Sequence, residues 1–151
     1  MKVDCETLQL LEMIKLDAIS ALIRTHRPIA SITDSFGRMP LHLACMHVSN
    51  CGETAFYIIL EAWPKAAAHQ DVEGRAPLHY LVARNDDIPL RMLEKVIATC
   101  PSALTMKDLV KETPLNIVES RRSEIRNVDV VLKLLKQSDT PTGSIDTGVT
   151  P

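Results

Sequence analysis

The densest group of potential metal ligands in this sequence is His42-x-x-Cys45-x-His47-x-x-x-Cys51. Imidazole nitrogens and thiolates are the ligands that zinc prefers, so these residue types would suit a small metal-binding regulatory module. The spacing opposes that reading, because on a helix His42 and Cys45 share a face while His47 points about 200° away from Cys45. We expect His42, like His79, to hydrogen-bond within its own segment and Cys45 to pack as a small apolar residue. We predict no metal and no other cofactor.

The sequence contains no motif that would supply catalysis. Its 5 glycines do not form a phosphate-binding loop, and no Gly-x-Ser-x-Gly segment is present to expose a nucleophilic serine. We therefore predict that the chain is not an enzyme. The remaining enzymatic alternative is a regulatory segment of a larger enzyme, with catalysis in a domain beyond Pro151.

Charge and hydropathy argue against two classes of partner. The 17 basic and 19 acidic residues leave a net charge of −2, which provides no overall attraction to nucleic acid or to an anionic membrane. Asp4 and Glu6 stand where a signal peptide has its basic and apolar regions, and no uncharged apolar run is long enough to span a bilayer. We expect an intracellular protein, cytoplasmic or nuclear, that binds neither nucleic acid nor membrane.

The size and composition suit one folded unit. With 151 residues, 46% of them apolar, the chain can bury a core, and an aromatic content of 3% favours a helical array over a β-sandwich or barrel. Because a helical core of this size needs no disulfides, we expect reduced thiols at Cys5, Cys45, Cys51 and Cys100. We expect a monomer.

A repeat is the element that must position all these side chains. A pattern that begins at Asp34 recurs at Asp71 and at Asp108, at an interval of 37 residues each time. A Pro-Leu pair recurs in step with it, at Pro40-Leu41, Pro77-Leu78 and Pro114-Leu115. A constant interval with aligned apolar positions is typical of stacked helical units, each burying one face against the next.

Each unit is predicted to be a turn followed by an inner and an outer helix. In the first unit Asp34 can hydrogen-bond to nearby amides, Gly37 can take a positive φ, and Pro40 suits the first turn of the inner helix. The buried stripe of that helix is expected to be Leu41, Ala44 and Cys45. A polar link at 49–52 would lead to an outer helix that Pro64 ends. The buried residues of the outer helix are predicted to be Phe56, Ile59, Leu60 and Trp63.

The later units follow the same pattern. In the second unit the predicted buried residues are Leu78, Leu81, Val82, Leu93, Val96, Ile97 and Cys100. In the third unit the outer helix is predicted over 128–136, and Lys111 stands where the other units have glycine, so we expect it to be forced toward a positive φ. Helices at 4–16 and 17–27 precede the first turn. We divide the chain into a capping helix pair at 4–33, repeats at 34–70, 71–107 and 108–137, and a disordered tail at 138–151.

The segments 34–43, 71–81 and 108–117 resemble the ankyrin repeat, whose core pattern is Asp-x-x-Gly-x-Thr-Pro-Leu-His-x-Ala. One copy retains Asp34, Gly37, Pro40, Leu41, His42 and Ala44, and the next retains Asp71, Gly74, Pro77, Leu78 and His79. The threonine survives only as Thr113, Asn116 replaces the histidine of the third copy, and the interval of 37 residues exceeds the family's period of about 33.

This resemblance implies an all-α, ankyrin-type helix-turn-helix solenoid of about three repeats plus an N-terminal capping helix pair. It also implies a non-catalytic protein-protein interaction scaffold or adaptor. In that family the contact surface lies on the turn tips and on the exposed side of each inner helix. Carried over residue by residue, it comprises the tips Ser35, Phe36, Val72, Glu73, Leu109 and Val110, the flanking Arg38, Gln70, Arg75, Lys107 and Glu112, and the helical His47, Arg84 and Arg121.

Two parts of this surface have alternative interpretations. The 37-residue register places His47, Arg84 and Arg121 in one column, which would suit an acidic helix or an extended peptide, but these residues would also be ordinary solvated side chains. Phe36 on its turn tip would serve either as an interface residue or as a local packing partner for Val72. Trp63 is predicted to be part of the core.

Overall fold

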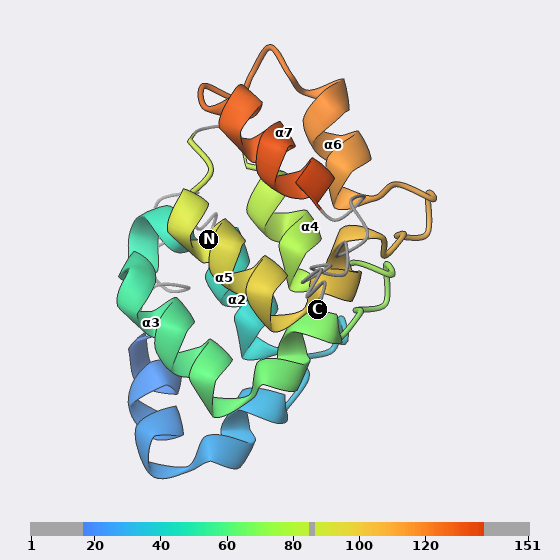
Figure 1. Ribbon diagram of the computed structural model, residues 1–151. Helices are drawn as coiled ribbons and strands as arrows, with labels where there is room; N and C mark the ends of the chain where they lie inside the picture. Colours follow the sequence, from blue (N-terminus) through green and yellow to red (C-terminus); the bar gives the residue numbers. More distant parts are fainter. Residues whose placement is uncertain (1–16, 85–86, 138–151) are drawn as a thin grey trace, which may run out of the picture.

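The computed structural model describes residues 17–84 and 87–137, without the side chains of residues 49–52. This part of the chain contains helices and no strand (Figure 1). Residues 17–25 are helical. The other α-helices are α2 (Pro40–Met46), α3 (Val48–Ala62), α4 (Pro77–Val82), α5 (Leu90–Thr99), α6 (Pro114–Ser120) and α7 (Val128–Lys136). Short 3-10 helices, η1 (Arg27–Ser31), η2 (Pro64–Ala68) and η3 (Pro101–Leu104), connect them.

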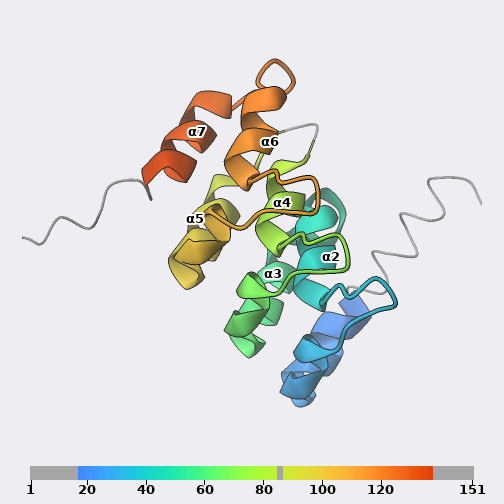
Figure 2. The same cartoon turned by 90° about the vertical axis from the view of Figure 1, so that its right-hand side faces the viewer.

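The inner helices α2, α4 and α6 each begin with a proline, whose missing N–H costs nothing in the first turn of a helix. The residue before each proline is extended and is the N-cap of the helix. α2 packs against α4, and α4 packs against α6. Figure 2 shows the inner helices in one column, with the loop before each projecting to the same side.

Outer helices cover the opposite side of this column. α3 packs against α2, α5 against α4, and α7 against α6. After α3 and after α5 a single residue, Trp63 or Cys100, precedes the proline that opens the next 3-10 helix. In α5 the buried residues are Met92, Leu93 and Val96, and in α7 they are Val131, Leu132 and Leu135. The buried pattern thus recurs after 39 residues rather than 37 in these outer helices.

The core is one continuous cluster of buried apolar side chains from the helical segment 17–25 to α7. Leu41, Ala44 and Cys45 of α2 are fully buried, as are Leu78, Leu81 and Val82 of α4, so the predicted inner-helix stripes are confirmed. The predicted outer-helix residues Phe56, Ile59, Leu60, Leu93, Val96 and Cys100 are also buried. Ile97 and Trp63 are partly buried and pack against the cluster from its edge.

The polar link predicted at 49–52 is wrong, because these residues lie within α3 and only His47 separates α2 from α3. Ser, Asn and Gly favour turns through local backbone effects of about 1 kcal/mol or less per residue. Burial of Phe56, Ile59 and Leu60 farther along the same helix outweighs that preference. The predicted helix at 4–16 and the predicted tail at 138–151 lie outside the described residues.

No helix in the described part of the chain is long and apolar enough to cross a membrane.

Candidate functional site

The loops before the inner helices share one hydrogen-bond pattern. In the first, Asp34 Oδ1 accepts from the amides of Phe36 and Arg38, both at 2.9 Å, and the amide of Gly37 donates to the Asp34 carbonyl at 3.0 Å. Asp71 accepts equivalent bonds in the second loop, at 2.9 and 3.0 Å, and Asp108 in the third, at 3.0 and 2.9 Å. An aspartate that accepts two backbone amides stabilises a tight turn, so each loop is a rigid hairpin.

Each hairpin needs one residue in the left-handed region. Gly37 has a φ of 72° and Gly74 a φ of 74°, and Lys111 has a φ of 68° at the equivalent position. A side chain normally makes this conformation unfavourable, since Cβ comes too close to the following carbonyl oxygen. The predicted positive φ of Lys111 is confirmed.

Neighbouring hairpins are joined by backbone hydrogen bonds. The amide of Val72 donates to the Phe36 carbonyl at 3.0 Å, and the amide of Leu109 donates to the Glu73 carbonyl at 2.9 Å. Gln70 adds a side-chain bond, because its amide nitrogen donates to the Lys107 carbonyl at 3.1 Å. We call this row of joined hairpins, residues 34–38, 71–75 and 108–112, the hairpin edge.

Two buried histidines, His42 and His79, hydrogen-bond to backbone carbonyls of the hairpin edge. Nδ1 of His42 accepts from the Met39 amide at 3.1 Å, which leaves the proton on Nε2, and Nε2 lies 3.1 Å from the His69 carbonyl and 3.2 Å from the Arg75 carbonyl. His79 repeats this arrangement one unit later and reaches the Glu112 carbonyl at 3.3 Å. Burial lowers the pKa of both imidazoles. These histidines therefore link each unit to the next, beyond the bonding within one unit that the sequence predicted.

A second polar cluster lies at the base of the middle hairpin. The hydroxyl of Tyr80 donates to Asp71 Oδ2 at 2.5 Å, while Arg75 pairs with Glu73 at 2.8 Å and lies 3.7 Å from Asp108 Oδ2. Burial and the bond to Asp71 raise the pKa of Tyr80 to about 12. The carboxylates of Asp71 and Asp108 are almost fully buried, so these partners compensate for the loss of hydration.

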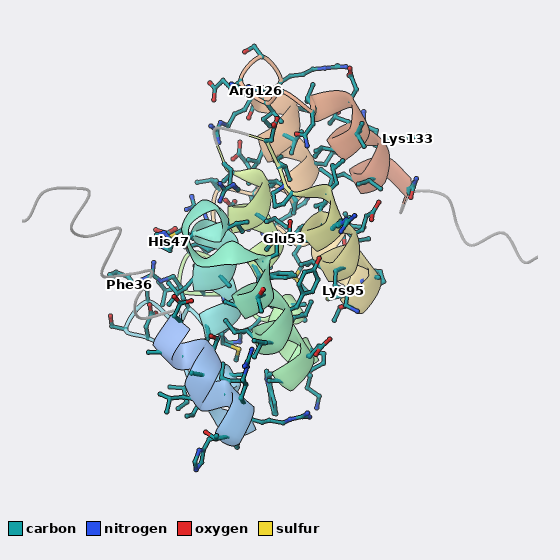
Figure 3. All side chains as sticks on the ribbon, turned by 90° about the vertical axis from the view of Figure 1, so that its left-hand side faces the viewer. Phe36, His47, Glu53, Lys95, Arg126 and Lys133 are labelled. Carbon is teal, nitrogen blue, oxygen red and sulfur yellow. The ribbon has the colours of Figure 1, made fainter. Side chains whose placement is uncertain are left out.

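The tips of the hairpin edge expose large apolar side chains. The exposed fractions are 57% for Phe36, 59% for Val72, 70% for Leu109 and 68% for Val110. The Arg38 guanidinium lies over the Phe36 ring, 4.8 Å from its centroid, so Phe36 has a local partner and yet remains open to solvent. In Figure 3 Phe36 lies at one edge of the molecule, opposite Lys95 and Lys133 of the outer helices.

The structure brings most of the predicted binding residues together on the hairpin edge or, for Gln70 and Lys107, directly before its second and third hairpins. The exposed ones are Ser35, Phe36, Gln70, Val72, Glu73, Lys107, Leu109 and Val110, and the partly buried ones are Arg38, Arg75 and Glu112. Arg38 is paired with Asp34 at 2.8 Å. Gln70 bonds to the Gly74 and Lys107 carbonyls, which gives it a role in the fold that the sequence did not reveal.

The predicted column of basic residues does not lie on the exposed side of the inner helices. His47 and Arg121 are the C-cap residues of α2 and α6, Arg84 follows the C-cap of α4, and all of them are partly buried. Arg121 donates to the Ala83 carbonyl of the preceding unit and pairs with Glu124 at 2.8 Å. The expectation of a solvated side chain is therefore wrong for Arg121, because the carbonyl groups at the end of an inner helix attract a cation.

The potential zinc ligands His42 and Cys45 have other roles in the structure. Both ring nitrogens of His42 hydrogen-bond to backbone groups, and Cys45 is buried in the core. The side chain of Cys51 lies outside the described residues. Within the described residues no group of three or more His, Cys, Asp or Glu side chains is arranged to hold a metal ion.

Sequence reasoning missed one residue of this surface. The sequence predicts the positive φ of Lys111 but not its place on the binding surface, where it is exposed and next to the Leu109–Val110 tip. The signal was present in the sequence, since a lysine replaces glycine at a turn position only against a conformational cost.

Comparison of the chain with protein-family models and with curated proteins found no match.

Proposed function

We propose that this chain is a non-catalytic interaction scaffold of ankyrin type, which binds a partner protein through the hairpin edge. The observation that carries the proposal is the concentration of exposed large apolar side chains there. Phe36, Val72, Leu109 and Val110 are on the hairpin tips, whereas Leu22, Ile32 and Val130 are the remaining exposed large apolar residues of the described chain. Apolar side chains grouped on one exposed surface are typical of a protein interface.

Rigidity supports the same function. The aspartate bonds within each hairpin and the backbone bonds between hairpins hold the tips in fixed positions before a partner arrives. A preformed surface loses little conformational entropy on binding, so more of the contact energy is available as affinity.

The ankyrin assignment is supported by three features taken together: the Asp-x-x-Gly hairpins, the proline-initiated inner helices stacked in one column, and the outer helices on the opposite side. An intracellular location and a monomeric state are parts of the same proposal. Buried thiols at Cys45 and Cys100 suit a reducing compartment.

Affinity capture with purified tip variants tests this function. The chain carrying Phe36→Ser, Val72→Ser and Leu109→Ser is compared with the parent and with a control carrying Leu22→Ser and Val130→Ser, and captured proteins are quantified by mass spectrometry. We expect a protein that the parent and the control retain but the tip variant does not, and direct binding of that protein to be measurable by calorimetry. If every reproducibly captured protein is retained equally by the tip variant, the hairpin edge is not the binding surface.

A further inference from the structure

The end of the hairpin edge at residues 108–112 differs from the other hairpins in three respects. It exposes two adjacent apolar side chains, Leu109 and Val110, which are the most exposed large apolar residues in the described chain. Lys107 and Lys111 flank them, and both are exposed. Neither lysine forms an ion pair with any of the described residues.

In the other hairpins the basic residue forms an ion pair within its own hairpin. Arg38 is paired with Asp34, and Arg75 is paired with Glu73. The buried carboxylate of Asp108 already accepts two backbone amides and faces Arg75, so it contributes little compensation to the lysines. Glu112, partly buried in the same hairpin, balances the second lysine in number, so what distinguishes this end is that its exposed charges are those of Lys107 and Lys111.

A backbone acceptor is also left open there. The carbonyls of Phe36 and Glu73 each accept an amide from the next hairpin, and Val110 occupies the equivalent position in the last hairpin. Among the described residues, no amide donates to the Val110 carbonyl. An additional peptide strand can pair with that group as each hairpin pairs with its neighbour, which is the general mode of recognition by strand addition.

The backbone at Lys111 gives a further reason to assign a role to this end. A φ of 68° is unfavourable for lysine, and glycine occupies the equivalent position in both other hairpins. A residue held in a strained conformation is an indication of function, here a cation presented beside the apolar tip.

We propose that this end of the hairpin edge binds an extended peptide segment of a partner protein that is both acidic and apolar. Its apolar side chains contact Leu109 and Val110, its carboxylates pair with Lys107 and Lys111, and one of its amides donates to the Val110 carbonyl. The inference rests on the proposed function and specifies the chemistry of the partner. A peptide suits this end better than an anionic membrane does, because two lysines on one hairpin match a short acidic segment, whereas the net charge of −2 opposes approach of the whole chain to an extended anionic surface.

Fluorescence anisotropy with synthetic peptides tests the inference on the full chain. The probe is a labelled peptide in which Glu alternates with Leu and Val. Two matched peptides replace every Glu by Lys, or every Leu and Val by Ser. We expect measurable binding of the acidic-apolar probe only, with an affinity that falls as salt is raised. Equal binding of the Lys peptide, or no binding of the acidic-apolar probe, contradicts the inference.

Charge reversal at the hairpin identifies the binding surface. Lys107→Glu with Lys111→Glu should weaken binding of the acidic-apolar probe by about tenfold, since two exposed ion pairs become repulsive. The control, Lys95→Glu with Lys133→Glu, makes the same change in net charge on the outer helices and should leave binding unchanged. Circular dichroism of both variants confirms that the helices are intact.

The outcomes separate this inference from the broader function. If a partner from affinity capture depends on Phe36 and Val72 but binds the Lys107→Glu, Lys111→Glu variant normally, the scaffold function stands and the acidic-peptide inference fails. Cosedimentation of the chain with phosphatidylserine vesicles, lost on the same charge reversal and accompanied by no peptide binding, would assign this end to a membrane surface and overturn the inference.

Discussion

Lys111 adopts a φ of 68° at the place where Gly74 adopts a φ of 74°, so the last hairpin has the same backbone shape as the middle one with a less suitable residue. The difference between them lies in what surrounds the residue. A Cβ on Gly74 would lie 3.1 Å from the Leu109 nitrogen and 3.2 Å from the Asp108 Cα, because the next hairpin packs directly against it. No further hairpin of the described chain packs against Lys111, and a side chain has room there.

Replacing Lys111 with glycine should therefore stabilise the protein, by about 1 kcal/mol, because the left-handed strain is relieved. Chemical denaturation would measure the gain, and hydrogen exchange should slow across residues 108–137. Gly74→Ala is the matched opposite change and should destabilise by about 1–3 kcal/mol, since it adds both strain and a close contact. Unchanged or lower stability of Lys111→Gly would refute the importance of the strain.

Acid should destabilise the fold through the buried histidines. Burial lowers the pKa of His79 below the ordinary histidine value of 6.5, against the opposing effects of the Glu112 carbonyl and the Asp108 charge. The unfolded chain therefore takes up protons first, so stability is fully present above pH 6.5 and is lost as pH falls toward the folded-state pKa. Denaturation at a series of pH values would measure the slope of the unfolding free energy against pH. His79→Asn, which copies Asn116 of the third unit, should reduce the slope, and an equally steep slope would assign it to other groups.

Tyr80→Phe should destabilise the middle unit, because the buried carboxylate of Asp71 loses the hydroxyl that donates to it. The expected cost is about 1.5–3 kcal/mol, typical of hydrogen bonds to charged groups. The same bond should be visible in a spectrophotometric titration, since the pKa of Tyr80 is raised to about 12 and its phenol stays protonated well above pH 10. Ionisation of both tyrosines near pH 10 would contradict the assigned bond.

Leu78→Ala should be among the most damaging single changes, because Leu78 is fully buried in the middle inner helix between two neighbours. We expect a loss of about 2–5 kcal/mol in the free energy of unfolding. Its counterpart in the third unit, Leu115, is only partly buried, so Leu115→Ala should cost less. Equal costs at the two positions would mean that α4 is no better covered than α6.

Features fixed by local chemistry were predictable from the sequence. Asp34, Gly37 and Pro40 each determine the backbone within a few residues of themselves, and the predicted hairpin and helix start are both found. The outer helix predicted over 128–136 has the bounds of α7. Periodic apolar residues with a proline boundary carry enough information for such elements.

Features that depend on contacts between units were not predictable. Arg121 reaches the Ala83 carbonyl, and Asn127 bonds to both the amide and the carbonyl of Ile88, across 39 residues. Periodicity aligns equivalent positions, but it does not reveal which long side chain turns back to a helix end and which stays in solvent. For the same reason, the column of basic residues looked like an exposed surface from spacing alone.

The bonds between hairpins have a consequence for how such a chain can lengthen. Each internal unit supplies a donor to the unit before it and an acceptor to the unit after it, as residues 71–107 do with the Val72 amide and the Glu73 carbonyl. A tandem duplication of that segment would keep both the donor and the acceptor that join it to its neighbours, and His79 would again bond to a carbonyl of the next copy. Insertion of a whole unit preserves the hydrogen bonds between hairpins, whereas insertion of part of a unit breaks at least one of them. Selection on such a gene would therefore favour gain or loss of entire units, and the length of the binding edge would change in discrete steps.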